Sequence, residues 1–288
     1  MQASFLSVVL LPVALAVIMM GLGLSLVIDD FKRVVVYPTA VAVGLACQII
    51  LLPLACFWLV SLWGLEPVLA VGMMLLAASP GGPTANLYSH IAKGDVALNV
   101  TLTAVNSVVS IFTLPLIVNL SMASLLASDQ AIPLQFRKIF EVCVMILIPV
   151  AIGMLVRNKA PKLAARLDKP VKITSALFLV GVIVLSILKE KSHIAEAFRQ
   201  VGLAALAFNL LSLATGYFIP KLFRISEKQS IAIGMEIGIH NGTLAIFIAL
   251  SVIGNSDMSI PPVIYSLIMF FTAALFGYWV NRNRKAET

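Results

Sequence analysis

The chain has 288 residues, of which 60% are apolar and only 11% are charged, and its mean hydropathy is +1.04. A soluble domain normally carries about 25% charged residues, so this chain has too few charges to cover a folded surface in water. The composition excludes an ordinary soluble enzyme, a disordered chain and a nucleic-acid-binding protein, despite a net charge of +7. It predicts an all-α polytopic membrane protein.

Apolar stretches of about 20 residues, the length that spans a bilayer, are separated along the chain by charged or Pro/Gly-rich breaks. The nine stretches predicted as transmembrane helices lie at about 4–27, 36–63, 67–91, 95–121, 134–156, 171–188, 199–222, 228–253 and 261–281. Two of these helices are predicted to be broken. The third is interrupted by Ser79-Pro80-Gly81-Gly82-Pro83, and the eighth by Gly238-Ile239-His240-Asn241-Gly242.

The basic residues predict the orientation. Fifteen of the twenty lie on the side of the C-terminus, and only Arg137, Lys138, Lys189, Lys191 and Arg199 lie on the other side. Because cytoplasmic loops are enriched in Lys and Arg, we expect a cytoplasmic C-terminus and an external N-terminus. Acidic residues at helix ends, such as Asp29 and Asp30, are expected to be solvated.

The chain also repeats itself. Ala70-Val71-Gly72-Met73 recurs as Ala232-Ile233-Gly234-Met235, an offset of 162 residues, and this register places the two breaks opposite each other. Gln48 then falls one position from Asn209. The first four helices pair with the last four. A five-helix unit that lacks its first helix in the N-terminal half would be repeated in opposite orientation (4+5), which is the inverted-repeat plan of secondary transporters.

The two breaks cannot face lipid. In hydrocarbon every backbone N–H and C=O group must be satisfied internally, so each break must be buried in protein or line a wet cavity. Unwound backbone offers carbonyl oxygens to a cation, and the half-helix that follows offers the positive end of its dipole to an anion. We expect the two breaks to meet near the middle of the bilayer.

Glu236 lies in the middle of the eighth segment, two residues before the break, with no basic residue near it. An ionisable side chain at that depth is costly, so it requires a cation or a proton. A carboxylate beside free carbonyls and side-chain amides makes a site of hard oxygen ligands that suits Na⁺. A protonated glutamate that bonds to backbone is the structural alternative.

Other polar residues lie inside the predicted spans, namely Gln48, Asn86, Asn99, Thr103 and Asn241. Asn99 and Thr103 are four residues apart and therefore share one helix face. Such residues often serve only to bond neighbouring helices, but together with Glu236 they indicate a cation site.

His240 lies within the second break, four residues after Glu236. It could donate to Glu236, ligate a cation through a neutral nitrogen, bind an anion when protonated, or carry a coupled proton. A plain hydrogen-bond donor between helices is the structural alternative. The residues alone leave these roles open.

Five stretches carry a resemblance to a known family. They are Gly21-Leu22-Gly23-Leu24-Ser25-Leu26 ahead of Asp30-Phe31, Gln48 ahead of Pro53-Leu54, Ser79-Pro80-Gly81-Gly82 with Asn86, Ala92-Lys93-Gly94-Asp95-Val96-Ala97-Leu98, and Glu236-Ile237-Gly238-Ile239-His240-Asn241. In this order and combination the chain resembles the bile acid:sodium symporter family and its bacterial homologues over nearly its whole length.

The resemblance implies a panel of helices that supports a core bundle, in which two broken helices cross. It implies sodium-coupled uptake of an organic anion by alternating access, with bile acids as vertebrate substrates and small carboxylates such as pantoate as candidate bacterial ones. The implied partners are Na⁺ as coupling ion with no other cofactor, a small organic anion and the bilayer of a bacterial inner membrane, and no nucleic acid.

The resemblance also implies site residues by position. One sodium site would use Asn86, Asn99, Thr103 and Glu236, and a second would use Gln48, Glu236, the carbonyls of Ile237 and Ile239, and His240. The substrate would sit near Thr84 and Asn241. Two positions depart from the family, which often has Ser where this chain has Ala85 and commonly Gln where it has His240. One hydroxyl ligand is therefore missing and one amide is replaced, which leaves the second site and the stoichiometry open.

The leading hypothesis is a single transmembrane transporter domain over residues 1–288, with one repeat at about 1–125 and the other at about 130–284, that couples sodium to uptake of an organic anion. The nearest alternative is a proton-coupled organic anion carrier that uses Glu236 and His240. A channel and a membrane-embedded enzyme are the other classes. We expect no enzyme, because no nucleophile–base pair or metal cluster is recognisable in the sequence.

Overall fold

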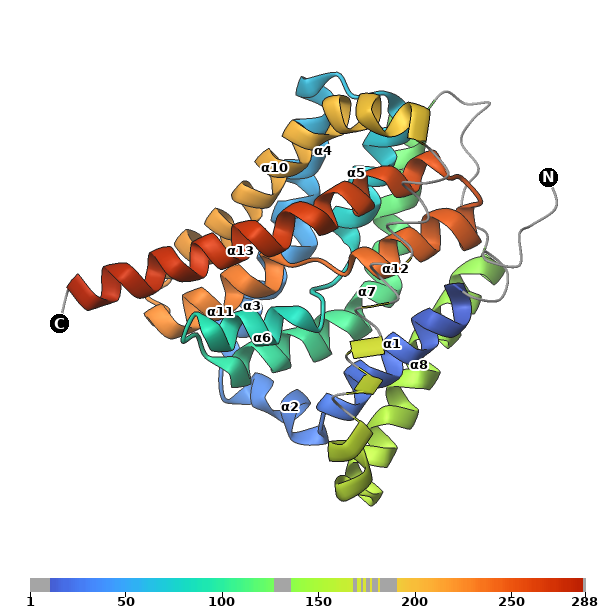
Figure 1. The fold of residues 1–288 in the computed structure, drawn as a ribbon. Coiled ribbons are helices and arrows are strands. Elements are labelled where there is room, and N and C mark those ends of the chain that lie inside the picture. The colour runs from blue at the N-terminus through green and yellow to red at the C-terminus, as the bar shows by residue number, and fades with distance from the viewer. Residues whose placement is uncertain are drawn as a thin grey trace.

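The computed structural model describes residues 11–126, 136–167, 170–171, 173–174, 177, 181 and 191–286. The helices in chain order are α1 (Leu11–Ser25), α2 (Ile28–Lys32), α3 (Pro38–Ala46), α4 (Leu52–Trp63), α5 (Pro67–Ala78), α6 (Thr84–Ile91), α7 (Val96–Leu125), α8 (Phe136–Lys159), α10 (Lys191–Leu222), α11 (Glu227–Gly238), α12 (Gly242–Phe247) and α13 (Ile260–Ala286) (Figure 1). Within the described residues no strand of a sheet is present, so the predicted all-α class is confirmed.

Four continuous helices in the described part of the chain are long and apolar enough to cross a membrane. They are Pro38–Trp63, Val96–Leu125, Phe198–Leu222 and Asp257–Asn283. These four correspond to the second, fourth, seventh and ninth predicted helices, and together with the apolar half-helices they make a multi-pass membrane protein. The sixth predicted helix, at about 171–188, lies mostly outside the described residues.

The second span shows how proline shapes a buried helix. Between α3 and α4 the residues Cys47–Leu51 form a π-helical turn, two residues ahead of Pro53. Proline lacks the N–H that an α-helix requires at that point, and a wider turn accommodates the loss. Gln48 lies inside this turn and is buried. The span ends at Gly64, whose φ of 63° is a left-handed conformation that favours glycine.

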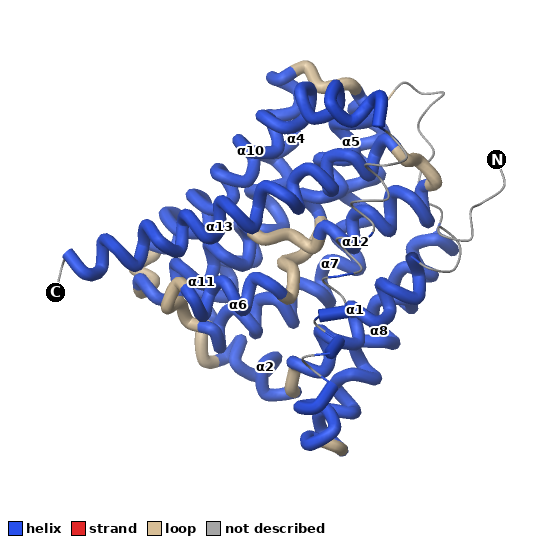
Figure 2. Tube along the Cα trace, in the orientation of Figure 1, coloured by secondary structure: helices blue, strands red, loops and turns tan. Residues whose placement is uncertain are grey.

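Both predicted breaks are present. α5 ends at Ala78, because Ser79 is extended (φ −72°, ψ 141°) as expected for a residue ahead of proline. α6 begins at Thr84, after five intervening residues. In the second half α11 ends at Gly238 and α12 begins at Gly242. Figure 2 shows the two connecting loops meeting in the middle of the molecule.

α1 and α8 lie side by side along one flank of the molecule (Figure 1). Glycines allow this close approach: a Cβ at Gly23 would collide with the backbone of Val150, and a Cβ at Gly153 would collide with the backbone of Met20. Small residues at helix interfaces are the usual means of close packing in membranes.

The segment after α1 departs from the sequence prediction. We expected Asp29 and Asp30 in a solvated break, but Ile28–Lys32 forms the short helix α2 and the Asp30 side chain is buried. Asp30 accepts a hydrogen bond from the Val27 amide at 2.7 Å and pairs with Arg33. Only Asp29 is exposed, where its hydrogen bond from Lys32 holds the pKa of the carboxyl below its ordinary value. The buried carboxylate is tolerated because it is hydrogen-bonded and paired.

Candidate cation site at the helix crossing

The two breaks pair with each other as short antiparallel segments. The Gly82 amide donates to the Ile239 carbonyl at 2.8 Å, and the Asn241 amide donates to the Pro80 carbonyl at 2.8 Å, so that Gly81 faces His240 in an isolated antiparallel bridge. The crossing thereby satisfies backbone groups that the broken helices leave open. It also joins α6 to α11 and α5 to α12.

Glu236 lies on α11 immediately beside this crossing and is only 1% exposed. Its Oε2 accepts a hydrogen bond from the Thr103 hydroxyl of α7 at 2.6 Å. A Cβ at Gly81 would collide with its carboxylate, so the glycine is what lets the first break approach the acid. Its Oε1 is buried and has no hydrogen-bond partner among the described residues.

Two asparagines from the first half of the chain present further oxygens. Asn99, on α7 one turn before Thr103, donates from Nδ2 to the Ala232 carbonyl of α11 at 2.7 Å. Asn86 lies on α6, which packs against both α7 and α11. The Oδ1 atoms of both side chains are buried without a partner in the described structure.

Gln48 and His240 meet at the Ser79 carbonyl of the first break. Gln48 Nε2 donates to this carbonyl at 3.0 Å, and His240 Nδ1 lies 3.2 Å from the carbonyl and 3.4 Å from Gln48 Nε2. His240 Nδ1 donates to the carbonyl in one tautomer of the neutral ring and accepts from Gln48 in the other. His240 Nε2 and Gln48 Oε1 are both buried without a partner in the described part of the chain. The ring packs against both Phe208 and Tyr265, with centroids 5.7 and 5.4 Å away.

The remaining predicted site residues lie in or next to the breaks. Ile237 and Ile239 are buried, and the Ile239 carbonyl already accepts from Gly82. Thr84 is exposed at the start of α6. Asn241 caps α12, since its Oδ1 accepts from the Leu244 amide at 3.0 Å.

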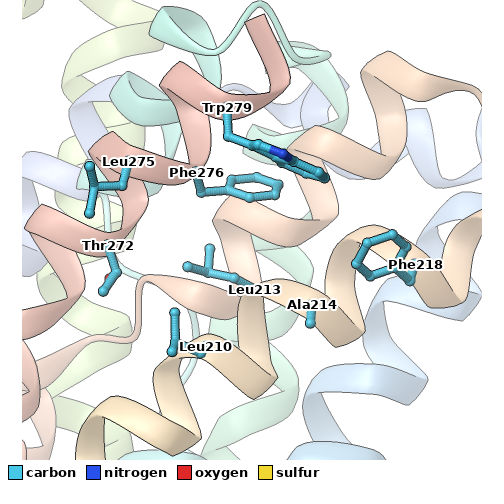
Figure 3. A pocket seen from close by; sticks show the side chains of 8 residues that line it. All are labelled: Leu210, Leu213, Ala214, Phe218, Thr272, Leu275, Phe276 and Trp279. Atoms are coloured by element: carbon cyan, nitrogen blue, oxygen red, sulfur yellow. The ribbon is translucent and has the colours of Figure 1, made fainter. Parts of the chain in front are cut away.

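Sequence reasoning missed the contribution of α13. Tyr265 donates to the Gly238 carbonyl at 3.0 Å, and Thr272 donates to Asn209. The one sequence signal for Tyr265 and Thr272 is that they are polar residues within an otherwise apolar stretch. Thr272 also lines an open groove of about 290 Å³ between α10 and α13, whose other seven lining side chains are apolar (Figure 3). None of the predicted site residues lines this groove.

The unpartnered atoms of the crossing have the chemistry of an alkali-cation site. Carboxylate, amide and hydroxyl oxygens are hard ligands that suit ions such as Na⁺, whereas soft or transition metals favour Cys and His. No group of three or more His, Cys, Asp and Glu side chains occurs among the described residues. A cation beside Glu236 would use the buried oxygens that the protein itself leaves unpaired.

Comparison with known proteins identifies the family of the chain. The Sodium Bile acid symporter family matches residues 12–197. The chain is 26% identical to the ileal sodium/bile acid cotransporter of Oryctolagus cuniculus, over 95% of this chain and 80% of the relative. It is 25% identical to the uncharacterized sodium-dependent transporter YocS of Bacillus subtilis, over 95% of this chain and 84% of that relative.

Chloroplast proteins are similarly related. The probable sodium/metabolite cotransporter BASS1 of Arabidopsis thaliana is 27% identical over 93% of this chain, and the chain spans 66% of that relative's length. The family consists of transporters, which agrees with the expectation that this chain is no enzyme. The family match covers well over half of the 288 residues and includes the first break with its polar side chains, and the chain belongs to the sodium bile acid symporter family.

Proposed function

We propose that this protein is a sodium-coupled symporter that carries an organic anion, a bile-acid-like molecule or a small carboxylate such as pantoate, by alternating access. The observation that carries the proposal is the buried Glu236 carboxylate, whose Oε1 lacks a partner among the described residues at the crossing of the two broken helices. A buried carboxylate needs a compensating charge, and a sodium ion supplies it.

The first sodium ion would be held by Asn86, Asn99, Thr103 and Glu236. This assignment is supported by the unpartnered Oδ1 atoms of the two asparagines and by the 2.6 Å hydrogen bond that brings Thr103 to Glu236. The second would be held by Gln48, Glu236, the carbonyls of Ile237 and Ile239, and His240. Gln48 Oε1 and His240 Nε2, both unpartnered in the described chain, support that assignment.

The organic anion would bind beside the crossing, near Thr84 and Asn241. Thr84 is exposed at the first residue of α6, and capping of α12 through Oδ1 leaves the Nδ2 group of Asn241 for a ligand. A substrate carboxylate there would face the amide-bearing starts of the two half-helices. Sodium binding would order the two breaks and thereby complete the substrate site.

The wider architecture belongs to the same proposal. It comprises nine transmembrane helices in one domain over residues 1–288, with inverted repeats at about 1–125 and 130–284 and with core and panel bundles that rock against each other. The antiparallel pairing of the two breaks supports the inverted relation. The protein would lie in a bacterial inner membrane with its N-terminus outside and its C-terminus in the cytoplasm.

The alternative is a proton-coupled carrier that uses Glu236 and His240. The hydrogen bonds favour sodium, since Glu236 bonds to Thr103 and the Nδ1 of His240 lies against the Ser79 carbonyl rather than the carboxylate.

Uptake into proteoliposomes tests the proposal. The purified chain is reconstituted into proteoliposomes that contain sodium-free buffer. Uptake of radiolabelled taurocholate and of pantoate is then followed under an inward Na⁺ gradient. The same uptake is measured with choline in place of Na⁺, and again with a proton gradient in the absence of Na⁺. We expect concentrative uptake of one of the two anions only with Na⁺. Uptake that persists in choline and follows the proton gradient would contradict sodium coupling in favour of the proton carrier.

A further inference from the structure

Asn209 is a fully buried amide on α10 that the proposed sodium sites do not use. Its Nδ2 donates to the carbonyl of Gly238, the last residue of α11, at 2.9 Å. Its Oδ1 accepts from the Thr272 hydroxyl of α13. Asn209 therefore ties two neighbouring helices to the point where α11 breaks.

The Gly238 carbonyl is held from two sides. Besides Asn209, the Tyr265 hydroxyl of α13 donates to it at 3.0 Å. The end of a helix leaves such carbonyls without intrahelical partners, and inside a membrane they require another donor. With both bonds made, this carbonyl is directed toward α10 and α13, and the carbonyls that flank it are those of Ile237 and Ile239.

The orientation of the Asn209 amide follows from its two partners. The Gly238 carbonyl can only accept, so the amide must present Nδ2 to it and Oδ1 to Thr272. The Thr272 hydroxyl also lies 3.1 Å from the Ile268 carbonyl and 3.0 Å from the Met269 carbonyl of its own helix, but only the bond to Asn209 links it to α10. The Thr272 hydroxyl thus fixes the orientation of the Asn209 amide through its hydrogen bond to Oδ1.

Gln48 has the corresponding position in the first half of the chain, and it too donates to a carbonyl at a break, that of Ser79. The two amides differ in their second atom. Gln48 Oε1 is unpartnered among the described residues, whereas Asn209 Oδ1 is occupied by Thr272. The Gln48 amide oxygen is therefore available to a ligand, whereas the Asn209 amide oxygen already accepts a hydrogen bond within the protein.

We propose that Asn209, supported by Thr272, is a positioning residue that holds the Gly238 carbonyl away from the crossing and so sets the direction of the neighbouring Ile237 carbonyl toward the second cation site, whereas the Ile239 carbonyl is fixed by the Gly82 amide. The inference rests on the proposed sodium-coupled function. Asn209 touches no ion in this arrangement and acts through the backbone of the break.

Three hydroxyl variants test the inference in the purified chain. Thr272→Val removes the hydroxyl at nearly constant shape, Thr272→Ser retains it, and Ser121→Ala is the matched control. Ser121 is buried on α7, and its hydroxyl donates to the Ile117 carbonyl of its own helix at 2.7 Å. The readout is the Na⁺ concentration that gives half of the sodium-induced thermal stabilisation. Loss of one buried hydrogen bond predicts a rise of about five- to tenfold in Thr272→Val, with little change in Thr272→Ser and Ser121→Ala.

A second readout does not depend on sodium. In sodium-free buffer, backbone amides of residues 239–245 should exchange hydrogen for deuterium faster in Thr272→Val and Asn209→Leu than in Ser121→Ala, because local opening of the break is no longer opposed. Equal half-saturation and equal exchange in all variants would overturn the inference. If the parent chain itself shows no response to Na⁺, the proposed function fails, and the exchange comparison still decides whether Asn209 holds the break.

Discussion

At the residue scale, several polar side chains at the crossing form a hydrogen bond through one atom and leave their other polar atom without a partner in the described chain. Asn99 and Gln48 each use their N–H groups on a backbone carbonyl of a broken helix, at 2.7 and 3.0 Å, and turn their oxygens elsewhere. Both oxygens are buried without a partner in the described chain, as is Glu236 Oε1. Unpaired buried acceptors are unfavourable on their own, and the cation that we propose beside Glu236 would give them a partner.

Glu236→Gln is expected to abolish sodium-dependent uptake, with at least about a tenfold loss, because an amide keeps the shape of the side chain but not its charge. Membrane insertion and sodium-free thermal stability should remain close to those of the parent. The measurement is uptake in proteoliposomes together with Na⁺-induced thermal shift. Glu66→Gln, at an exposed position ahead of α5, is the matched control. Uptake in Glu236→Gln at the level of this control would show that the carboxylate does not bind the coupling ion.

At the element scale, the fold depends on where helices stop and how closely they approach. The first break contains Pro80 and Pro83, which interrupt a helix, whereas the second consists of residues 239–241 between Gly238 and Gly242. The backbone of both breaks is satisfied by pairing with each other. In α1 and α8, by contrast, glycine does not end the helix but lets two continuous helices pack backbone against backbone. The crossing exposes backbone groups of unwound segments, whereas the α1–α8 pair forms a closely packed flank of the molecule.

Gly153→Leu is expected to destabilise the protein by about 1–3 kcal/mol, because the new side chain overpacks the contact with Met20 of α1. The thermal midpoint of the detergent-solubilised protein should fall by several degrees relative to the parent. Ala151→Leu, at an exposed position two residues earlier on α8, is the matched control. A midpoint that is the same in both variants would mean that α1 and α8 do not depend on this close contact.

At the scale of the whole molecule, the distribution of charge accounts for the orientation that we propose. The side assigned to the cytoplasm carries fifteen of the twenty basic residues, and the positive-inside rule acts through such short loops. With the orientation that we propose, the net charge of +7 would reflect topology rather than an acidic macromolecular partner.

Cysteine labelling checks this orientation. Ser256→Cys, exposed after the second broken helix, should react with a membrane-impermeant maleimide in intact cells. Asn158→Cys, exposed near the end of α8, should react only after permeabilisation. The parent chain provides the background, since its Cys47 and Cys56 are buried and Cys143 is partly buried. The reverse labelling pattern would invert the proposed topology.

Much of the fold could be predicted from local chemistry. The helix class follows from apolar stretches of bilayer length, and both breaks follow from proline and glycine, whose effects do not depend on distant residues. α2 could not be predicted in this way, because Asp30 is buried only through its bonds to the Val27 amide and Arg33. The sixth predicted helix, at about 171–188, lies largely outside the described residues and stays a prediction.

The apolar stretches and the Pro/Gly-containing interruptions are enough to predict a helical membrane protein and its two breaks. They also place Glu236 at a depth where we expect it to require a cation or a proton. Only the tertiary structure decided which groups meet: that Thr103 rather than His240 bonds Glu236, that His240 lies against the Ser79 carbonyl, and that Asn209 is closed by Thr272 while Gln48 remains open. The physical reason is that hydrogen bonds between helices depend on the register and rotation of residues far apart in the chain, whereas breaks and spans depend on neighbours.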